Sequence, residues 1–229
     1  MKRIAILSDI HSNLEALQAV AKNLDVDNVI VLGDSLGYGA NPNEVLEWIK
    51  DRNCTIIKGN HEEATITGNT GWFNSMAARA ILWTRQVLTS ANVEFLSSLE
   101  EKKLVELDGV RICLVHGSPN DPLYEYVYEE THSHFFDYYL QKEDANIIAL
   151  GHTHVPFLWS SKNGVILNPG SVGQPRDGDE RASFAILTVE DGVPMVEHRR
   201  VGYNIDAAAN KIRSAGLPAM LAERLYDGR

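Results

Sequence analysis

The segment IAILSDIH, residues 4–11, is the most informative one for the fold. Four apolar residues, 4–7, are followed within four positions by an aspartate and a histidine. An uninterrupted apolar run of this length is typical of a strand that is buried on both faces of a sheet. Similar runs occur at residues 29–32, 55–57, 112–115 and 147–150. We therefore expect these five segments to form a core sheet in a protein of the α/β class.

Helical segments alternate with the first three predicted strands. Residues 13–24 place apolar side chains at helical spacing after Asn13, which can cap the helix. Residues 41–44 combine a capping residue, a first-turn proline and a glutamate at the third helical position. These patterns predict a β-α-β-α-β order. An all-helical insertion is then predicted from about residue 65 to residue 99, between the third and fourth core strands.

The second half of the chain favours antiparallel strands and a short helical tail. Hairpin turns are predicted at Asp108-Gly109, Asn163-Gly164 and Asp191-Gly192. Residues 205–225 predict two short helices that are broken at residues 216–218. We see no repeat and no low-complexity linker, so we expect one domain over residues 1–229.

Composition limits the classes of function. The chain has 229 residues, 44% of them hydrophobic, which is enough for one α/β domain to bury a full core. Its 21 Lys and Arg against 31 Asp and Glu give a formal charge of −10. An acidic chain without a long basic run does not hold nucleic acid or anionic lipid by its overall field. An anionic substrate would need local positive charge, for instance from a metal ion.

Cysteines and the amino terminus bear on the compartment. Cys54 and Cys113 each lie in an apolar run, so we expect neither a disulfide framework nor a cysteine zinc site. The apolar run after Met1-Lys2-Arg3 is too short for a signal segment, and no apolar stretch reaches about 18 residues. We expect a cytoplasmic protein in a reducing compartment.

Polar side chains that bind metals follow all five predicted strands. They are Asp9, His11, Asp34, Asn60, His116, His152 and His154. Because loops at the carboxyl ends of strands converge in open α/β sheets, we expect these side chains to meet. The nitrogen and oxygen donors suit Mn²⁺, Fe, Zn²⁺ or Mg²⁺, and seven ligands fit two ions that share a carboxylate.

Two ligand pairs have i, i+2 spacing, which places side chains on one side of an extended chain. Asp9 with His11, and His152 with His154, are therefore each expected to chelate one ion. Residues 132–134, His-Ser-His, repeat this spacing but lead into a predicted helix, where i and i+2 diverge. We expect no ligand pair there.

The ordered motifs resemble the signature of the calcineurin-like metallophosphoesterases. They are Asp9-Ile10-His11, Gly33-Asp34, Gly59-Asn60-His61-Glu62, His116-Gly117 and Gly151-His152-Thr153-His154. The sequences of residues 33–39, 116–119 and 168–173 are similar to those of the small prokaryotic phosphodiesterases of the YfcE type. The resemblance implies a four-layer α/β/β/α sandwich of two mixed sheets flanked by helices.

The resemblance also implies a ligand set and a reaction. One ion would be held by Asp9, His11, Asp34 and His154, and the other by Asp34, Asn60, His116 and His152. We expect Mn²⁺ first, with Fe, Zn²⁺, Ni²⁺ or Mg²⁺ as alternatives. A hydroxide shared by the ions would attack the phosphorus in line, and His61 would protonate the leaving oxygen. Glu62 stands where many relatives have Asp, and we expect that difference to affect fine tuning only.

Other residues have a functional and a structural interpretation. Arg176 is a candidate to contact the substrate phosphate, and Tyr38, Tyr124 and Tyr126 are candidates to stack on a base or an aromatic leaving group. The alternatives are a solvated loop for Arg176 and rim packing for the tyrosines. We assign Trp72 and Trp83 to the core of the insertion. The insertion begins just after His61, so we expect it to shape the substrate pocket.

The sequence is compatible with three functions. The leading prediction is a dinuclear phosphoesterase that acts on a small phosphorylated substrate, on diesters more than monoesters. A scaffold protein of the same fold, such as the retromer subunit, is the alternative, and the presence of His61 disfavours it. A DNA-processing nuclease is disfavoured by the charge of −10. We expect no membrane partner and no stable nucleic-acid binding, and the oligomeric state stays open.

Overall fold

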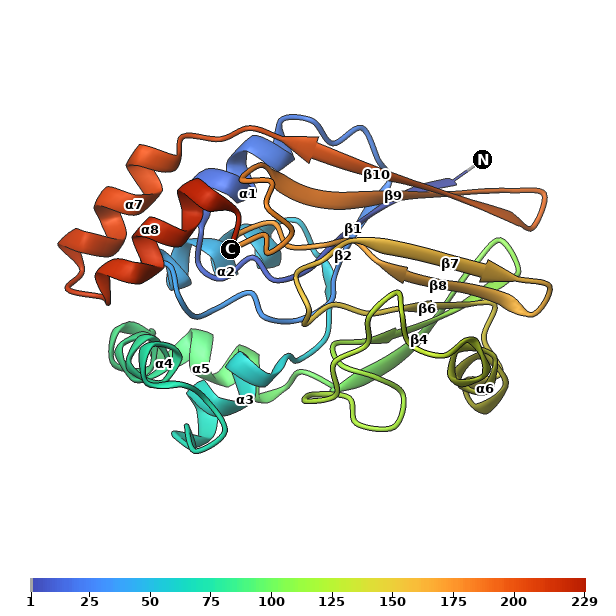
Figure 1. Cartoon of the computed structure of the whole chain (residues 1–229), viewed down its shortest axis with the longest axis horizontal. Coiled ribbons are helices and arrows are strands. Elements are labelled where there is room, and N and C mark those ends of the chain that lie inside the picture. Colours follow the sequence, from blue (N-terminus) through green and yellow to red (C-terminus); the bar gives the residue numbers. More distant parts are fainter. Residues whose placement is uncertain (1) are drawn as a thin grey trace.

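Two five-stranded sheets form the centre of the computed structural model, which describes residues 2–229 (Figure 1). In spatial order, the first sheet contains β10 (Val193–Val201), β9 (Ala182–Glu190), β1 (Lys2–Leu7), β2 (Asn28–Val31) and β3 (Thr55–Ile56). The second sheet contains β4 (Lys102–Leu107), β5 (Val110–Val115), β6 (Ile147–Ala149), β8 (Gly164–Asn168) and β7 (Phe157–Ser161). Both sheets are mixed, with parallel strands at their centres.

Helices cover the outer faces and one end of the sheets. They are α1 (Leu14–Ala21), α2 (Pro42–Asp51), α3 (Asn60–Thr67), α4 (Ser75–Val87), α5 (Ser90–Ser97), α6 (Ser133–Glu143), α7 (Ile205–Ser214) and α8 (Ala219–Asp227). Among the described residues 2–229, none of these helices is long and apolar enough to cross a membrane.

The four layers follow from the alternation of side chains along the strands. On β1, Ile4 and Ile6 pack in the cluster between the two sheets, together with Leu114 of the second sheet. Ala5 and Leu7 face the opposite way and pack with residues of α1 and α2. The second sheet packs its other face on α6. The α/β/β/α sandwich is therefore confirmed.

The five predicted core strands do not share one sheet. Three belong to the first sheet and two, β5 and β6, belong to the second. Each of these strands is buried on both faces, and an apolar run does not tell whether its second face meets a helix or another sheet. The parallel pairs β1–β2 and β5–β6 still place their functional loops at one end of the sandwich.

The local signals are confirmed in most places. The Asn13 side chain accepts a hydrogen bond from the Ala16 amide at the start of α1, and Pro42 begins α2. Hairpins join β4 to β5, β7 to β8 and β9 to β10 at the predicted turns. The tail forms two helices, α7 and α8, as predicted.

The helical segment between β3 and β4 begins earlier than the predicted residue 65. Helix α3 starts at Asn60, because the Glu62 side chain accepts a hydrogen bond from the amide of Gly59, the N-cap residue. The site residues Asn60 and His61 therefore lie in the first turn of a helix. In Figure 1, α3–α5 and α7–α8 lie at the same end of the sandwich, and the three hairpin turns lie at the other.

Gly173 joins two loops of the functional end by close backbone contact. Its amide donates to the Asp9 carbonyl, and a Cβ at this position would overlap with the Ile10 carbonyl oxygen. We expect Gly173→Ala to lower the free energy of unfolding by about 2 kcal/mol or more. Urea denaturation measures the change. Gly202→Ala is the matched control, because an added Cβ there meets nothing within 4 Å, and an equal loss in both variants would contradict the prediction.

Candidate metal centre

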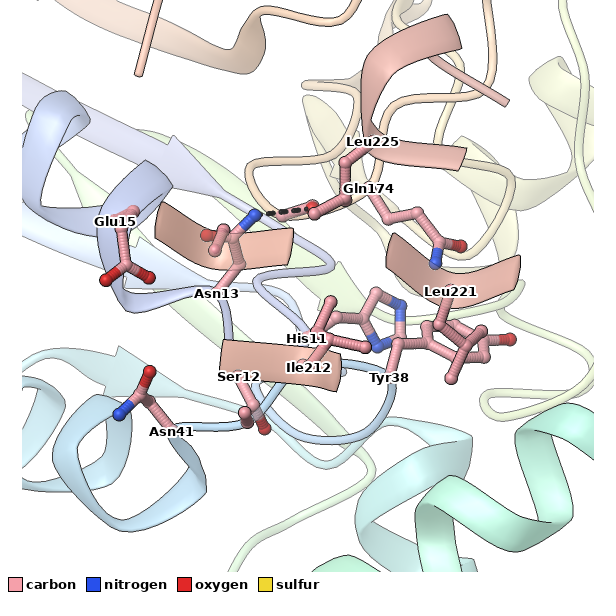
Figure 2. Close-up of a pocket in the computed structure, with 14 residues that line it drawn as sticks. His11, Ser12, Asn13, Glu15, Tyr38, Asn41, Gln174, Ile212, Leu221 and Leu225 are labelled. Carbon is pink, nitrogen blue, oxygen red and sulfur yellow. Dashed lines mark hydrogen bonds between the residues drawn. The ribbon is translucent and has the colours of Figure 1, made fainter. Parts of the chain in front are cut away.

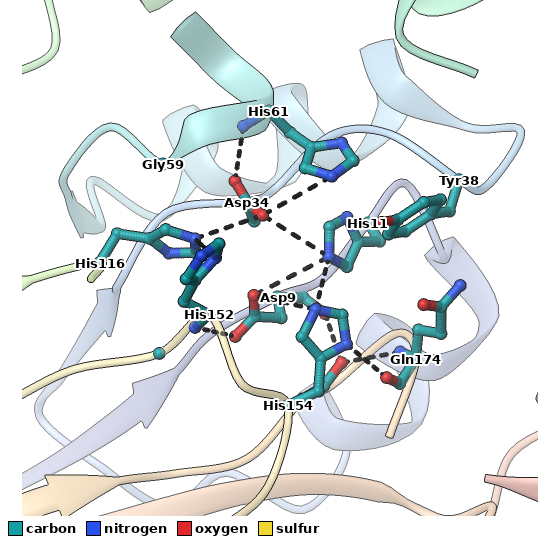
Figure 3. A network of polar contacts seen from close by, with 12 residues as sticks. Asp9, His11, Asp34, Tyr38, Gly59, His61, His116, His152, His154 and Gln174 are labelled. Carbon is teal, nitrogen blue, oxygen red and sulfur yellow. Dashed lines mark hydrogen bonds and ion pairs between the residues drawn. The ribbon is translucent and has the colours of Figure 1, made fainter. Parts of the chain in front are cut away.

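The structure brings the seven predicted metal ligands together at the carboxyl ends of the strands (Figure 3). Each is at most 3% exposed, although all seven are polar or titratable. Buried charges in proteins are paired or bind metals, because an isolated ion loses too much hydration energy. The His and Asp side chains form three overlapping groups, two that lie on either side and one between them: Asp9, His11 and His154; Asp34, His116 and His152; and His11, Asp34 and His61.

The backbone at these residues is strained. Five of the seven candidate ligands have positive φ, which is uncommon for residues other than glycine: Asp9 (53°), His11 (49°), Asp34 (48°), His152 (67°) and His154 (62°). Such residues cost about 1–3 kcal/mol each and persist where the surrounding structure forces them, often at functional sites. This strain marks the site independently of any sequence motif.

The first group consists of Asp9, His11 and His154. The Nε2 atoms of the two histidines are 3.1 Å apart, and His154 Nε2 lies 3.3 Å from Asp9 Oδ1. Both Nδ1 atoms face carbonyl oxygens, that of Leu36 for His11 and that of Gln174 for His154. A carbonyl only accepts, so each Nδ1 carries the proton and each Nε2 presents a lone pair.

The second group consists of Asp34, Asn60, His116 and His152. His116 donates from Nδ1 to the Leu32 carbonyl, so its Nε2 also points a lone pair into the site. That atom lies 3.3 Å from Asp34 Oδ2, 3.1 Å from Asn60 Oδ1 and 3.2 Å from His152 Nδ1. The Asn60 amide oxygen faces only other acceptors.

Lone pairs that face one another need a cation between them, and the donors fit a divalent metal. Asp9 Oδ1 is buried with no hydrogen-bond partner within the described chain. Imidazole nitrogen with carboxylate and amide oxygen is a donor set that Mn²⁺, Fe and Zn²⁺ accept. Asp34 Oδ2 lies 3.7 Å from His11 Nε2 and 3.3 Å from His116 Nε2, so one carboxylate faces both groups.

One expectation from the i, i+2 spacing is wrong. Asp9 and His11 belong to the same group, but His152 and His154 belong to different ones. The spacing rule holds for extended backbone, and all four residues of the two pairs have positive φ, so the rule applies to neither pair. His152 and His154 lie in different groups, as the ligand sets implied by the family resemblance require.

The carboxylates and imidazoles strongly perturb each other. Burial raises the pKa of Asp9 to about 7, whereas burial lowers the pKa of His11 and His154 well below the usual range. Burial also acts against the charge on His116, but Asp34 outweighs it and raises the His116 pKa to about 9. A proton on His116 can thus stabilise Asp34 where a cation does not, and metal binding at this group releases it.

Supporting residues hold the loops from behind. The Glu62 carboxylate is fully buried and accepts hydrogen bonds from the amides of Asp34 and Gly59, each at 2.8 Å, and from the Ser35 hydroxyl at 2.7 Å. It joins the loop after β2 to the start of α3 from behind the candidate ligands, and the effect of Glu in place of Asp here stays a prediction. Ser171 and Asn168 support neighbouring loops as predicted, through the carbonyls of Asp9 and Gly151.

His61 stands beside the two groups. Its amide donates to Asp34 Oδ1 at 2.9 Å, and its Nε2 lies 4.0 Å from Asp34 Oδ2. The ring packs against His11, Tyr38 and Phe73, and Nδ1 has no hydrogen-bond partner within residues 2–229. Burial lowers the pKa of His61 to about 4, against the opposite effect of Asp34, so the ring is neutral near pH 7.

A pocket of about 210 Å³ opens above His61, Asn60 and His152. Arg176 and Tyr38 line it, as expected of substrate contacts, whereas Tyr124 lies outside it and packs edge-on against Trp72. Its other walls come from Trp72, Phe73, Asn74, Ala77, Tyr126 and Arg224. The predicted insertion thus contributes residues to the pocket.

Trp72 is not part of the insertion core, which corrects the prediction. Its side chain is 51% exposed at the pocket, because residues 68–74 leave the helical path after Gly68 (φ 76°). Trp83 does pack against the cluster formed with α7 and α8. Sequence reasoning also missed Arg224, since nothing near residue 224 in the sequence indicates a site.

The surface pair His132 and His134 also differs from expectation. Their Nδ1 atoms are 3.0 Å apart, because His132 is the N-cap of α6 and has an extended backbone (φ −58°, ψ 129°). Both side chains are exposed, and their close approach involves no carboxylate.

A second cavity lies behind the site, beneath α7 and α8 (Figure 2). Its walls combine His11, Ser12 and Tyr38 with Ile212, Leu221 and Leu225 of the two C-terminal helices. The helix pair α7–α8 therefore packs directly behind residues of the metal centre.

Residues 1–192 match the family model of the calcineurin-like phosphoesterase superfamily domain. The chain belongs to this superfamily, a class of phosphoric ester hydrolases with a metal centre on an α/β fold. Several individual proteins are similar to this chain over its whole length. An uncharacterised protein of Methanocaldococcus jannaschii is 39% identical over 99% of this chain and 98% of its own.

Two solved structures are similar over 100% of this chain and 99% of their own. A metallophosphoesterase from Sphaerobacter thermophilus has a TM-score of 0.86 at 35% identity. A hypothetical protein from Pyrococcus horikoshii has a TM-score of 0.90 at 21% identity, which shows a common fold.

Glu62 offers a test of how the metal loops are positioned. We expect Glu62→Gln to weaken metal binding by about 10- to 100-fold, because an amide group would face the Asp34 and Gly59 amides with a donor. Stability should fall by about 2–4 kcal/mol. Calorimetric Mn²⁺ titration and urea denaturation measure the two effects.

Glu63→Gln is the control for this test. Glu63 lies on the same helix but pairs with Lys58 at 3.1 Å near the surface, so its loss should cost at most about 1 kcal/mol. Equal metal affinities in the two variants would show that Glu62 does not position the ligands.

Proposed function

We propose that this protein is a dinuclear metal-dependent phosphoesterase that hydrolyses small phosphate esters, diesters in preference to monoesters. The observation that carries the proposal is two groups of buried, mutually facing acceptors that share Asp34. Two cations satisfy both groups, whereas hydrogen bonds within the chain leave acceptors unpaired.

The ligands divide as the geometry suggests. One ion would bind Asp9, His11, His154 and Asp34, and the other Asp34, Asn60, His116 and His152. Mn²⁺ stays our first choice, and a donor set of four imidazoles with carboxylate and amide oxygens and no thiolate also suits Fe or Zn²⁺. When bound, two divalent ions lower the pKa of a shared water and offset the charge of the phosphoryl oxygens.

His61 is the candidate proton donor to the leaving oxygen. It lines the pocket next to the ligands Asn60 and His152, and its Nε2 lies 4.0 Å from Asp34 Oδ2, between the two groups. Burial lowers the pKa of His61 to about 4, and the negative charge of a phosphoryl group beside the ring would raise it. The alternative role is to orient the phosphoryl oxygens with a neutral N–H.

Arg176 provides the local positive charge that an acidic protein needs for an anionic substrate. It lines the same pocket and donates to Gln174 Oε1 at 3.0 Å and to the Tyr38 hydroxyl at 3.3 Å. Preference for diesters is supported by the resemblance to YfcE-type enzymes and by aromatic walls that offer room for a second ester group.

The scaffold alternative accounts less well for the site. A fold kept for protein contacts does not require five strained ligand residues or a buried His61, and both carry a cost in stability. Hydrolysis of a panel of phosphodiesters, monoesters and cyclic nucleotides by Mn²⁺-loaded protein tests the proposal. A scaffold would turn over none of them.

The number of ions is a direct test. We expect elemental analysis to find about two ions per chain after Mn²⁺ loading. Asp34→Asn should lose more metal than Asp9→Asn or His116→Ala, because Asp34 faces both groups. His132→Ala, at the surface, should keep both ions. One ion in the wild type, or better retention by Asp34→Asn than by the other ligand variants, would refute the bridging assignment.

The role of His61 can be tested by measuring how the rate loss in a His61 variant depends on the leaving group. We expect His61→Gln to keep both ions and to slow esters of poor leaving groups by about 10²- to 10⁴-fold. A p-nitrophenyl ester should be affected less, because its phenolate needs little protonation. Rates over a series of leaving groups measure the trend.

Two outcomes of this series exclude the assignment. An equal slowing of all esters with full metal content assigns His61 to orientation of the substrate. Loss of an ion from the variant makes His61 a ligand.

A further inference from the structure

Two arginines face the pocket without an acidic partner. Within the described residues 2–229, neither Arg176 nor Arg224 forms an ion pair with an Asp or Glu side chain. Arg224 donates from Nε to the Arg229 carbonyl at 2.6 Å, and Arg176 Nε is buried with no partner. Five other arginines do have such partners: Arg3, Arg111, Arg181, Arg199 and Arg200.

The two charges are close enough to act together. Both side chains line the pocket that reaches Asn60, His61 and His152. Burial, followed by the charge of Arg176, lowers the pKa of Arg224. Two like charges held beside each other are stabilised by an anion that binds both, and guanidinium groups bind phosphate in a bidentate manner.

Another part of the pocket wall is aromatic and partly exposed to solvent. The Tyr126 ring stacks on His152, with centroids 4.0 Å apart and planes at 16°. The Trp72 ring lies nearly parallel to both, 6.0 Å from Tyr126 and 5.9 Å from His152. Trp72 and Tyr126 are 51% and 42% exposed, so much of each side chain is open to solvent. Exposed, aligned aromatic rings next to a cationic pocket are suited to a planar heterocycle.

We propose that the pocket selects a nucleotide-type substrate with at least two phosphoryl groups. The group to be cleaved lies at the metal centre, a second phosphoryl group lies between Arg176 and Arg224, and the base stacks on Trp72 and Tyr126. This inference rests on the proposed function and specifies the substrate class of the same site.

The arginine pair is assigned to a second phosphoryl group for two reasons. The metal ligands and His61 already provide for the group that is cleaved. Arg224 lies on α8, outside the residues 1–192 that match the superfamily domain, so it is an addition to the common machinery. Additions to a shared catalytic core are suited to recognising the rest of a substrate.

Ligand affinity tests the arginine pair. Titration calorimetry on the Mn²⁺-loaded full-length protein would compare AMP with α,β-methylene-ADP, whose P–C–P bridge resists hydrolysis, and product analysis after each titration checks that the ligand is intact. We expect the wild type to bind the diphosphate analogue at least about tenfold more tightly. Arg224→Gln should remove most of that preference. Arg213→Gln, an exposed arginine on α7, should keep it.

Two results would overturn the second-phosphate assignment. One is an equal loss of affinity for AMP and the analogue in Arg224→Gln, which would place the arginines on the single phosphoryl group. The other is no loss for either ligand. Thermal unfolding checks that the variants are folded, and Arg176→Gln makes the same comparison if Arg224→Gln is not.

A parallel comparison tests the aromatic wall. We expect the wild type to prefer AMP over ribose 5-phosphate by about tenfold, and Trp72→Leu to reduce that preference to near one. Tyr138→Leu, an exposed tyrosine on α6, is the control. An unchanged preference in Trp72→Leu would overturn the assignment of a base to this wall.

These measurements separate the inference from the proposed function. Arg224-dependent and Trp72-dependent binding without hydrolysis of any ester would leave the ligand class standing and refute the enzyme. Hydrolysis of phosphate esters with binding that is independent of Arg224 and Trp72 would refute the ligand class alone.

Discussion

The mutual approach of buried acceptors around Asp34 is the constraint on which this structure depends. Carboxylate oxygens and imidazole lone pairs lie 3.1–3.8 Å apart in a site from which water is largely excluded. Their repulsion and the positive φ angles of five ligands cost free energy that a cation offsets when it binds. The surrounding fold must hold this arrangement, and the buried Glu62 carboxylate and the close backbone contact at Gly173 do so.

The candidate ligands and the other residues of the pocket come from different parts of the fold. Loops after the parallel strands carry the ligands, and the sheets hold these loops rigidly from both layers. The segment between β3 and β4 and the helix pair α7–α8 lie at the same end of the sandwich. Trp72, between α3 and α4, and Arg224, on α8, both line the pocket. Chemistry and recognition thus come from different segments, so recognition can change without disturbing the ligands.

Much of the site could be predicted because its signals are local. A metal-binding residue directly after an apolar run shows where a strand ends, and parallel strands end at a shared edge. Asp9, His116 and His152 were all found in this way. The spacing rule failed for His152 and His154, since it assumes extended backbone, and positive φ at all four residues of the two pairs leaves the direction of their side chains to be set by tertiary contacts. The same assumption of regular structure misplaced Trp72, which follows a break after Gly68 rather than a helix.

The strands, the hairpins, the helical tail and the identities of the candidate ligands could be predicted from the sequence, because each depends on residues within a few positions of one another. Three features are seen only in the folded chain: which strands share a sheet, which histidines face the same carboxylate, and that Arg224 lines one pocket with Arg176 and Trp72. Propensity, capping and periodicity act along the chain, whereas these contacts depend on how buried faces pack, and many sequences satisfy the same packing.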